Sequence, residues 1–325
     1  MTIRTTTVGT LGLTLLLLGG PGGGRPAAQV VARQSAAQEV TKAQFDRWMT
    51  ELSNWGRWGM DDERGALNLI TDATRRAAAA LVRTGTAVSL SRPIRRGSPT
   101  AAQEPRPVNT SGAFTSRFLI QGDYLFERQE LEYHGTTLSH FDALCHVSYN
   151  GRNYNNFLFR DIVTPDGGCS RLSVDAARDG IVTRGVLVDL PGVAVGPAEM
   201  TAWEKSTGIR IQAGDALLLR TRRSTQSGDR APGGYSPSLI PFFKERDIAL
   251  LGSDIPQEGG TVPGVAIPIH VFTLVALGVH LLDNLALDEL AATAERLKRW
   301  EFMLSIQPVR AERGAGGPVN PVAIF

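Results

Sequence analysis

Three of the chain's five histidines lie within thirteen positions, at His134, His140 and His146, and Asp142 stands between the last two. If residues 130–142 form an extended segment, His134, His140 and Asp142 share one face, because every second side chain of a strand points to the same side. A helical turn after Asp142 would bring His146 to that side as well. Imidazoles and a carboxylate that converge in this way suit zinc or manganese, with coordination positions left open for water and substrate. An isolated His-x-Asp pair is more often a hydrogen-bonded pair in the core, but the density of histidines here favours a metal site.

The elements that must position these residues are interpreted from hydrophobic periodicity and from capping signals. Helices are predicted at 41–53, 72–84, 197–207, 238–246, 268–277 and 287–298. Strands are predicted at 86–91, 185–190, 215–220, 248–252 and 301–309, and the last ten residues are predicted to form turns. Helices and strands interleave without the regular alternation of a doubly wound fold, which indicates an α/β or α+β class with a mixed sheet.

The segment around His140 resembles the metal-binding motif of the cyclase family, which includes kynurenine formamidases and isatin hydrolases. The family pattern is His-x-Gly-Thr-His-x-Asp-x-Pro-x-His, and His140, Asp142 and His146 match its second histidine, its aspartate and its final histidine. Similar stretches at 54–71, 211–221, 280–290 and 316–325 extend the resemblance over most of the chain after about residue 42. The resemblance implies a swivelling β/β/α domain with a mixed central sheet and flanking helices, which we expect to span residues 33–325.

The sequence departs from the family pattern at its first histidine, which falls on Thr136. His134 lies one strand step earlier and could supply the missing imidazole. Further along, His270 and Asp283 stand where the family has a metal-site histidine and a glutamate. The implied ligands, for one metal ion or two, are therefore His134, His140, Asp142, His270 and Asp283.

The resemblance also implies an activity. A divalent metal would activate water against a carbonyl group, and His146 would be the catalytic acid or base; orienting Asp142 is the alternative role for His146. The expected enzyme is an amidohydrolase that cleaves the C–N bond of an aryl formamide, as in tryptophan catabolism, or of a cyclic amide. A lactone hydrolase, a cyclase or dehydratase, and a non-catalytic metal-binding or ligand-binding protein remain alternatives.

Other residues are assigned from chemistry of lower specificity. Trp55, Trp58 and Tyr154 could line an aromatic substrate pocket or could be ordinary core aromatics. His280 is interpreted as a surface or core residue. The two cysteines, Cys145 and Cys169, could form a disulfide, or Cys145 could be a small buried hydrophobic residue.

The N-terminus and the charge balance bear on location and partners. Residues 8–18 form an apolar run after Arg4, of the length of a signal-peptide core and too short to span a bilayer, so residues 1–32 are predicted to be a cleaved signal peptide. The protein would then be exported, to a periplasm or to the medium, with no membrane segment after cleavage. The formal net charge of only +2 argues against a nucleic-acid partner. A small-molecule substrate and a homodimer or larger homo-oligomer are expected.

Overall fold

The computed structural model describes residues 39–94, 114–135, 138–221 and 233–325. The predicted signal peptide and Thr136 lie outside these ranges. Residues Ala36–Phe325 group as one compact unit. Among the described residues, no helix is long and apolar enough to cross a membrane.

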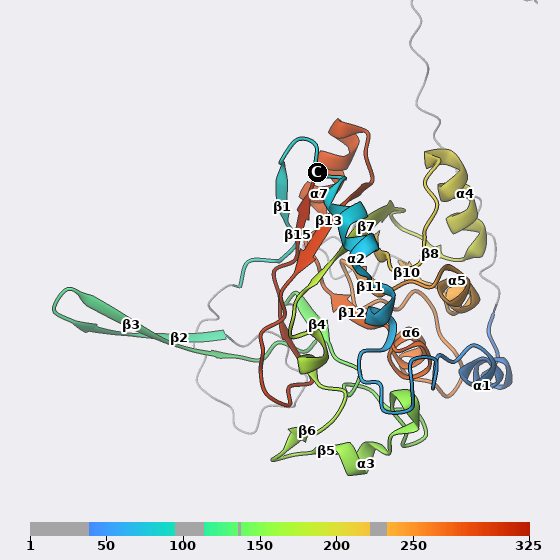
Figure 1. Cartoon of the computed structure of the whole chain (residues 1–325), viewed down its shortest axis with the longest axis horizontal. Helices are drawn as coiled ribbons and strands as arrows, with labels where there is room; N and C mark the ends of the chain where they lie inside the picture. Colours follow the sequence, from blue (N-terminus) through green and yellow to red (C-terminus); the bar gives the residue numbers. More distant parts are fainter. Residues whose placement is uncertain (1–38, 95–113, 136–137, 222–232) are drawn as a thin grey trace, which may run out of the picture. The chain divides into compact units, whose positions relative to one another are not determined.

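Within the described residues, a nine-stranded mixed sheet forms the centre of this unit, with the strand order β1-β15-β13-β7-β9-β11-β12-β4-β14 (Figure 1). Its strands are β1 (Ala87–Ser89), β4 (His140–Asp142), β7 (Ile181–Asp189), β9 (Ala216–Arg220), β11 (Leu250–Ser253), β12 (His280–Asp283), β13 (Glu301–Ile306), β14 (Gly316–Pro318) and β15 (Val322–Ile324). Strands β7, β9, β11 and β12 run parallel to one another, and the remaining pairs are antiparallel. The near-continuous apolar runs of β7 and β9 are buried, as expected for parallel strands that are covered on both faces. The expected mixed sheet with flanking helices is confirmed.

The helices form largely where the capping signals predict them. They are α1 (Lys42–Glu51), α2 (Asp72–Ala79), α3 (Phe159–Ile162), α4 (Pro197–Thr207), α5 (Ile240–Arg246), α6 (Pro268–His270), which continues as a π-helical segment over Val271–Leu277, and α7 (Asp288–Leu297). Helix α4 matches its predicted bounds, with Pro197 in the first turn and Gly208 in the left-handed conformation after the last. Helix α2 ends five residues before the predicted Thr84, and its N-cap is Thr71, whose side chain accepts a hydrogen bond from the backbone of Thr74.

Outside the central sheet, the described residues also form three two-stranded pairs. They are β2 (Phe114–Gln121) with β3 (Tyr124–Leu131), β5 (Val163–Thr164) with β6 (Gly168–Cys169), and β8 (Ala194–Val195) with β10 (Gly234–Tyr235). The prediction that the chain closes in turns was wrong, since β14 and β15 both join the central sheet. The prediction of one long extended segment over residues 130–142 was also wrong. Strand β3 ends at Leu131, and β4 contributes only His140–Asp142.

Candidate metal centre

Asp142 ends β4, where this strand lies between β12 and β14. Its backbone is opposite Leu281 on one side and Gly316 on the other. Gly316 has φ +149°, and a Cβ atom there would lie 2.0 Å from the carbonyl oxygen of Phe141. Only glycine therefore allows β14 to approach closely enough to hold the Asp142 end of β4.

Imidazole rings surround the Asp142 carboxylate on three sides. The Nε2 atoms of His134 and His140 lie 3.4 Å and 3.6 Å from its Oδ1 atom, and the Nε2 atom of His270 lies 3.9 Å from its Oδ2 atom. Two ligands at about 2 Å from one tetrahedral metal ion are separated by about 3.3 Å. The distance from Asp142 to each of His134 and His140 is therefore close to that between two ligands of one cation.

The hydrogen bonding of Asp142 fits the same interpretation. The residue is fully buried, yet neither carboxylate oxygen has a hydrogen-bond partner within the described part of the chain. The Nε2 atom of His134 is buried and has no partner among these residues either. A buried carboxylate without hydrogen bonds costs several kcal/mol, and a divalent cation would remove that cost. The buried carboxylate without a hydrogen-bond partner therefore supports a metal ion at these residues, independently of the sequence motif.

Two trios of possible ligands share Asp142. One combines it with His134 and His146, and the other with His140 and Asp283, and within each trio the ligand atoms lie within 4.8 Å of one another. Nitrogen and carboxylate oxygen donors without thiolates are typical of zinc, manganese or iron sites. The shared carboxylate gives this arrangement room for one ion or for two.

Neighbouring acceptors fix the orientation of two of these histidines. The Nδ1 atom of His140 donates to the carbonyl oxygen of Leu138 at 2.8 Å, and that of His270 donates to Glu258 Oε1 at 2.8 Å. Each bond leaves the Nε2 atom directed at the site, as in metal-bound histidines whose other nitrogen is held by a carboxylate or a carbonyl. Glu258 also accepts the backbone N–H groups of Ile269 and His270, so it fixes both the helix start and the ring.

Asp283 also faces His270, with its Oδ2 atom 3.2 Å from His270 Nε2. Its Oδ1 atom accepts a hydrogen bond of 2.6 Å from the side-chain amide of Gln257. Gln257 thus orients a candidate ligand. The structure brings together all five predicted ligands and the predicted catalytic residue.

The electrostatics of the centre follow from burial and from this dense charge. Burial would raise the pKa of Asp142, but His146, His134 and His140 outweigh it and hold the pKa well below its usual range. Burial disfavours a charged His270, whereas Asp283 and Glu258 raise its pKa well above the ordinary value. Burial lowers the pKa of His146, which favours its neutral form. The site therefore combines an ionised carboxylate with a neutral imidazole that can accept a proton.

The rings of His146 and Tyr133 both pack against His134. The His146 ring stacks on that of His134 with centroids 4.2 Å apart and planes at 7°, and the Tyr133 ring packs at 4.2 Å. Burial and the negative charge of Asp142 raise the pKa of Tyr133 to about 12, so its hydroxyl stays protonated. Sequence reasoning missed Tyr133 and Glu258, for which the only available signal was the proximity of Tyr133 to His134 in the chain.

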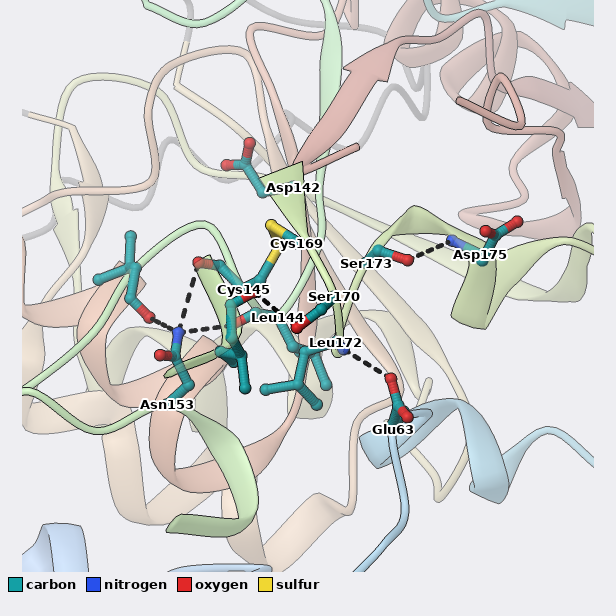
Figure 2. The surroundings of a disulfide bond; sticks show 12 residues. Glu63, Asp142, Leu144, Cys145, Asn153, Cys169, Ser170, Leu172, Ser173 and Asp175 are labelled. Carbon is teal, nitrogen blue, oxygen red and sulfur yellow. Dashed lines mark hydrogen bonds between the residues drawn. A yellow bond between two sulfur atoms is a disulfide. The ribbon is translucent and has the colours of Figure 1, made fainter. Parts of the chain in front are cut away.

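A disulfide joins Cys145 to Cys169 just behind the centre, and this settles the pairing that the sequence left open. Figure 2 shows that the Asp142 carboxylate points away from the disulfide, on the other side of the chain. The side-chain amide of Asn153 donates to the carbonyl oxygens of Leu144 and Cys145, and the Cys145 N–H donates to the carbonyl of Leu172. The turn from Asp142 to His146 is closed by a hydrogen bond from the His146 N–H to the Ala143 carbonyl, so it is a tight turn and not the predicted helical turn.

The three predicted substrate-binding aromatics have separate surroundings. The indole of Trp55 donates to the Val275 carbonyl and lines a cavity of about 400 Å³ beside α1, and Trp58 packs against the guanidinium of Arg57. Tyr154 is fully buried, and its hydroxyl donates to Asp62. These contacts are those of core and cavity residues. His280 is also buried, with Nδ1 3.2 Å from the Asp142 carbonyl oxygen, and burial lowers its pKa to about 4.

Comparisons with known proteins agree with this geometry. A sequence profile of the Cyclase family matches residues 88–258. A crystal structure of a novel cyclase shares 27% identity with a TM-score of 0.74, covering 85% of this chain and 99% of that one. Two isatin hydrolases share the fold. Isatin hydrolase A from Ralstonia solanacearum has 20% identity and a TM-score of 0.50, covering 79% of this chain and 98% of that one. An isatin hydrolase bound to the product analogue thioisatinate has 18% identity and a TM-score of 0.52, covering 79% of this chain and 99% of that one. No curated protein matches significantly. On the profile match, which spans more than half of the sequence, the chain belongs to the cyclase family.

Proposed function

We propose that this protein is a metal-dependent hydrolase that cleaves the C–N bond of a cyclic amide or an aryl formamide. The observation that carries the proposal is the buried Asp142 carboxylate, which has no hydrogen-bond partner in the described residues and faces the Nε2 atoms of His134, His140 and His270. Membership of the cyclase family supports it. The fold shared with isatin hydrolases, which open a cyclic amide, supports the substrate class.

Each residue has a distinct part in the reaction. Asp142 would hold the metal, with His140 and Asp283 in one group of ligands and with His134 in the other, and His270 lies beside them. The bound metal would polarise the substrate carbonyl and lower the pKa of a water molecule towards 7. His146, which burial keeps neutral, accepts a proton from the attacking water and returns it to the leaving nitrogen. Burial of the centre excludes bulk water and strengthens these interactions.

The central test measures metal content and turnover together. The protein is stripped with a chelator, reloaded with zinc or manganese, and assayed on isatin, N-formylkynurenine and a simple lactone. His140→Ala and Asp142→Asn should lose both the metal and the activity. Asp288→Asn, a carboxylate-to-amide change at an exposed residue on α7, is the matched control and should retain both. Metal binding without turnover on any of these compounds would identify a binding protein, and turnover of the lactone alone would assign an ester substrate.

Two further variants separate ligand from catalyst. His146→Gln should retain the metal and lose at least about 100-fold in kcat, the usual contribution of a positioned acid or base. His134→Ala should lose the metal. If His134→Ala keeps both its metal content and its rate, His134 is not a ligand.

We also propose that the protein is exported. Residues 1–32 have the pattern of a signal peptide. The buried disulfide supports this location, because such bonds persist in oxidising compartments. Fractionation of cells that produce the full chain tests it, and a protein that stays in the cytosol with its first 32 residues attached would contradict it.

A further inference from the structure

Four of the five candidate ligands are closed off from solvent. Their side chains are at most 7% exposed: His140, Asp142, His270 and Asp283. The fifth, His134, is 32% exposed, and the rings of Tyr133 and His146 that pack against it are partly buried. Among the described residues, these three rings therefore form the side from which a substrate can approach the centre.

The ring of Tyr133 packs on two of the candidate ligands. Its centroid lies 4.2 Å from that of His134 and 6.0 Å from that of His140. The two imidazole centroids are 5.6 Å apart, and both rings direct Nε2 at Oδ1 of Asp142. Tyr133 thus lies against the pair of imidazoles beside the carboxylate, at the open side of the centre.

The hydroxyl of Tyr133 is a polar group at this opening without an assigned role. Within the described part of the chain it has no hydrogen-bond partner, although the hydroxyl of a buried tyrosine usually has one. Burial and the negative charge of Asp142 both raise its pKa, so the hydroxyl is partly shielded from water and within electrostatic reach of the carboxylate. At neutral pH a tyrosine hydroxyl carries its proton and can donate a hydrogen bond. The opening therefore offers a donor to a bound molecule.

We propose that Tyr133 is a catalytic residue whose hydroxyl donates a hydrogen bond to the carbonyl oxygen of the bound amide. The inference rests on the proposed hydrolase function and adds a group that stabilises negative charge in its transition state. As the oxygen of water bonds to the carbonyl carbon, the π electron pair of the carbonyl moves to its oxygen, and His146 takes the proton from water. The pair returns when the C–N bond breaks, and the proton on His146 passes to the leaving nitrogen. A positioned donor binds the negative oxygen more strongly than the neutral carbonyl, so it lowers the barrier.

The positions of Tyr133 and His146 suit this division of roles. Both rings pack on His134 with centroids 4.2 Å away, so a carbonyl held beside His134 is near an acid–base group and near a hydrogen-bond donor. The alternative role for Tyr133 is packing of its ring against an aryl group of the substrate. Packing does not need the hydroxyl, so the two roles predict different results for Tyr133→Phe.

The test compares the native protein with Tyr133→Phe, both loaded with zinc, on formanilide and on its thiocarbonyl analogue, thioformanilide. On formanilide, and equally on isatin, the variant should lose about 100-fold in kcat, the usual effect of removing one oxyanion donor, with KM and zinc content unchanged. Sulfur is a weak hydrogen-bond acceptor, so on thioformanilide the loss should be less than about tenfold. Any effect of sulfur on the zinc is common to both proteins and cancels in the comparison. Tyr124→Phe, the same change at a 73% exposed residue of β3, is the matched control and should retain native rates.

Ligand binding gives a readout that does not depend on turnover. The dissociation constant of phenylphosphonate, whose charged oxygens resemble the tetrahedral intermediate, should rise at least about tenfold in Tyr133→Phe by calorimetry. A native kcat in this variant would overturn the inference in favour of packing, and so would an unchanged phosphonate affinity. Equal losses on formanilide and thioformanilide would show a structural role and would also overturn it. A native protein that hydrolyses neither formanilide nor isatin refutes the proposed function itself, whereas the other outcomes leave that function standing.

Discussion

Reduction of the Cys145–Cys169 disulfide gives a quantitative test of how the region behind the site is stabilised. The bond closes a loop with a sequence separation of 24 residues, and the two Cα atoms are 6.3 Å apart, within the normal range. Loss of the cross-link increases the conformational entropy of the unfolded chain. For a loop of this length, the chain-entropy relation gives a loss of about 3.5 kcal/mol in the free energy of unfolding. At about 2 °C or more per kcal/mol for a domain of this size, the midpoint of thermal unfolding should fall by about 7 °C or more.

The assay compares metal-free native protein with and without a phosphine reductant, by guanidinium denaturation. Reduction keeps both sulfur atoms, so no cavity is created and the loop term alone changes. The variant Cys145→Ala/Cys169→Ala is the control, since the reductant should not alter its stability. If thiol titration finds two thiols after reduction while the free energy of unfolding is unchanged, the loop-entropy reasoning is refuted.

Reduction of the disulfide should have only a small effect on metal binding. The backbone around Cys145 is also held by the amide of Asn153 and by the bond from the Cys145 N–H to Leu172. These contacts remain when the disulfide opens. We therefore expect the metal dissociation constant to rise less than tenfold, and a rise of 100-fold or more would show that the disulfide itself positions the ligands.

Three other changes test separate parts of the structure. Glu258→Gln should raise the metal dissociation constant 10- to 100-fold in a chelator competition, because His270 loses its charged partner; no change would exclude His270 as a ligand. Gly278→Ala should lower the free energy of unfolding by more than about 2 kcal/mol, since φ is +64° and the new Cβ would lie 2.6 Å from the Tyr154 ring; native stability in a thermal melt would contradict the packing described here. Metal at about 100 times its dissociation constant should stabilise the native protein against unfolding by about 2.7 kcal/mol. It should not stabilise Asp142→Asn. Equal stabilisation of both proteins in calorimetry would place the ion elsewhere.

The sequence predicts elements well where the signal is local. Helix α4 is an example, because Pro197 and Gly208 mark its two ends without help from distant residues. Strand β14 was missed, because its Gly-Gly-Pro sequence has no strand propensity and pairs only because β4 lies beside it. The β2–β3 hairpin was missed although Gly122-Asp123 is a recognised turn signal. Its flanking runs are apolar on both faces and lack the alternation that identifies a half-buried strand.

The structure brings the predicted members of the candidate site together, but in a geometry that differs from the expected one. His134 was expected to reach the metal from an unbroken strand, but it faces Asp142 from an irregular segment after β3. Glu258 could not be predicted, because its role arises only when the segment after β11 brings it against the start of α6, twelve residues further along the chain. Residue types near Asp142 in the sequence thus predicted the candidate ligands, and the tertiary fold alone supplied the groups that orient them.

The stacking of His134 and His146 separates their roles by electrostatics. Their parallel rings are 4.2 Å apart, and two positive charges at that distance repel strongly in a buried site. A protonated His146 is therefore tolerated only while His134 is neutral, which is also the state in which His134 offers a lone pair. Burial also lowers the pKa of His146, which favours its neutral form. That property suits a residue that accepts a proton in one step and releases it in the next.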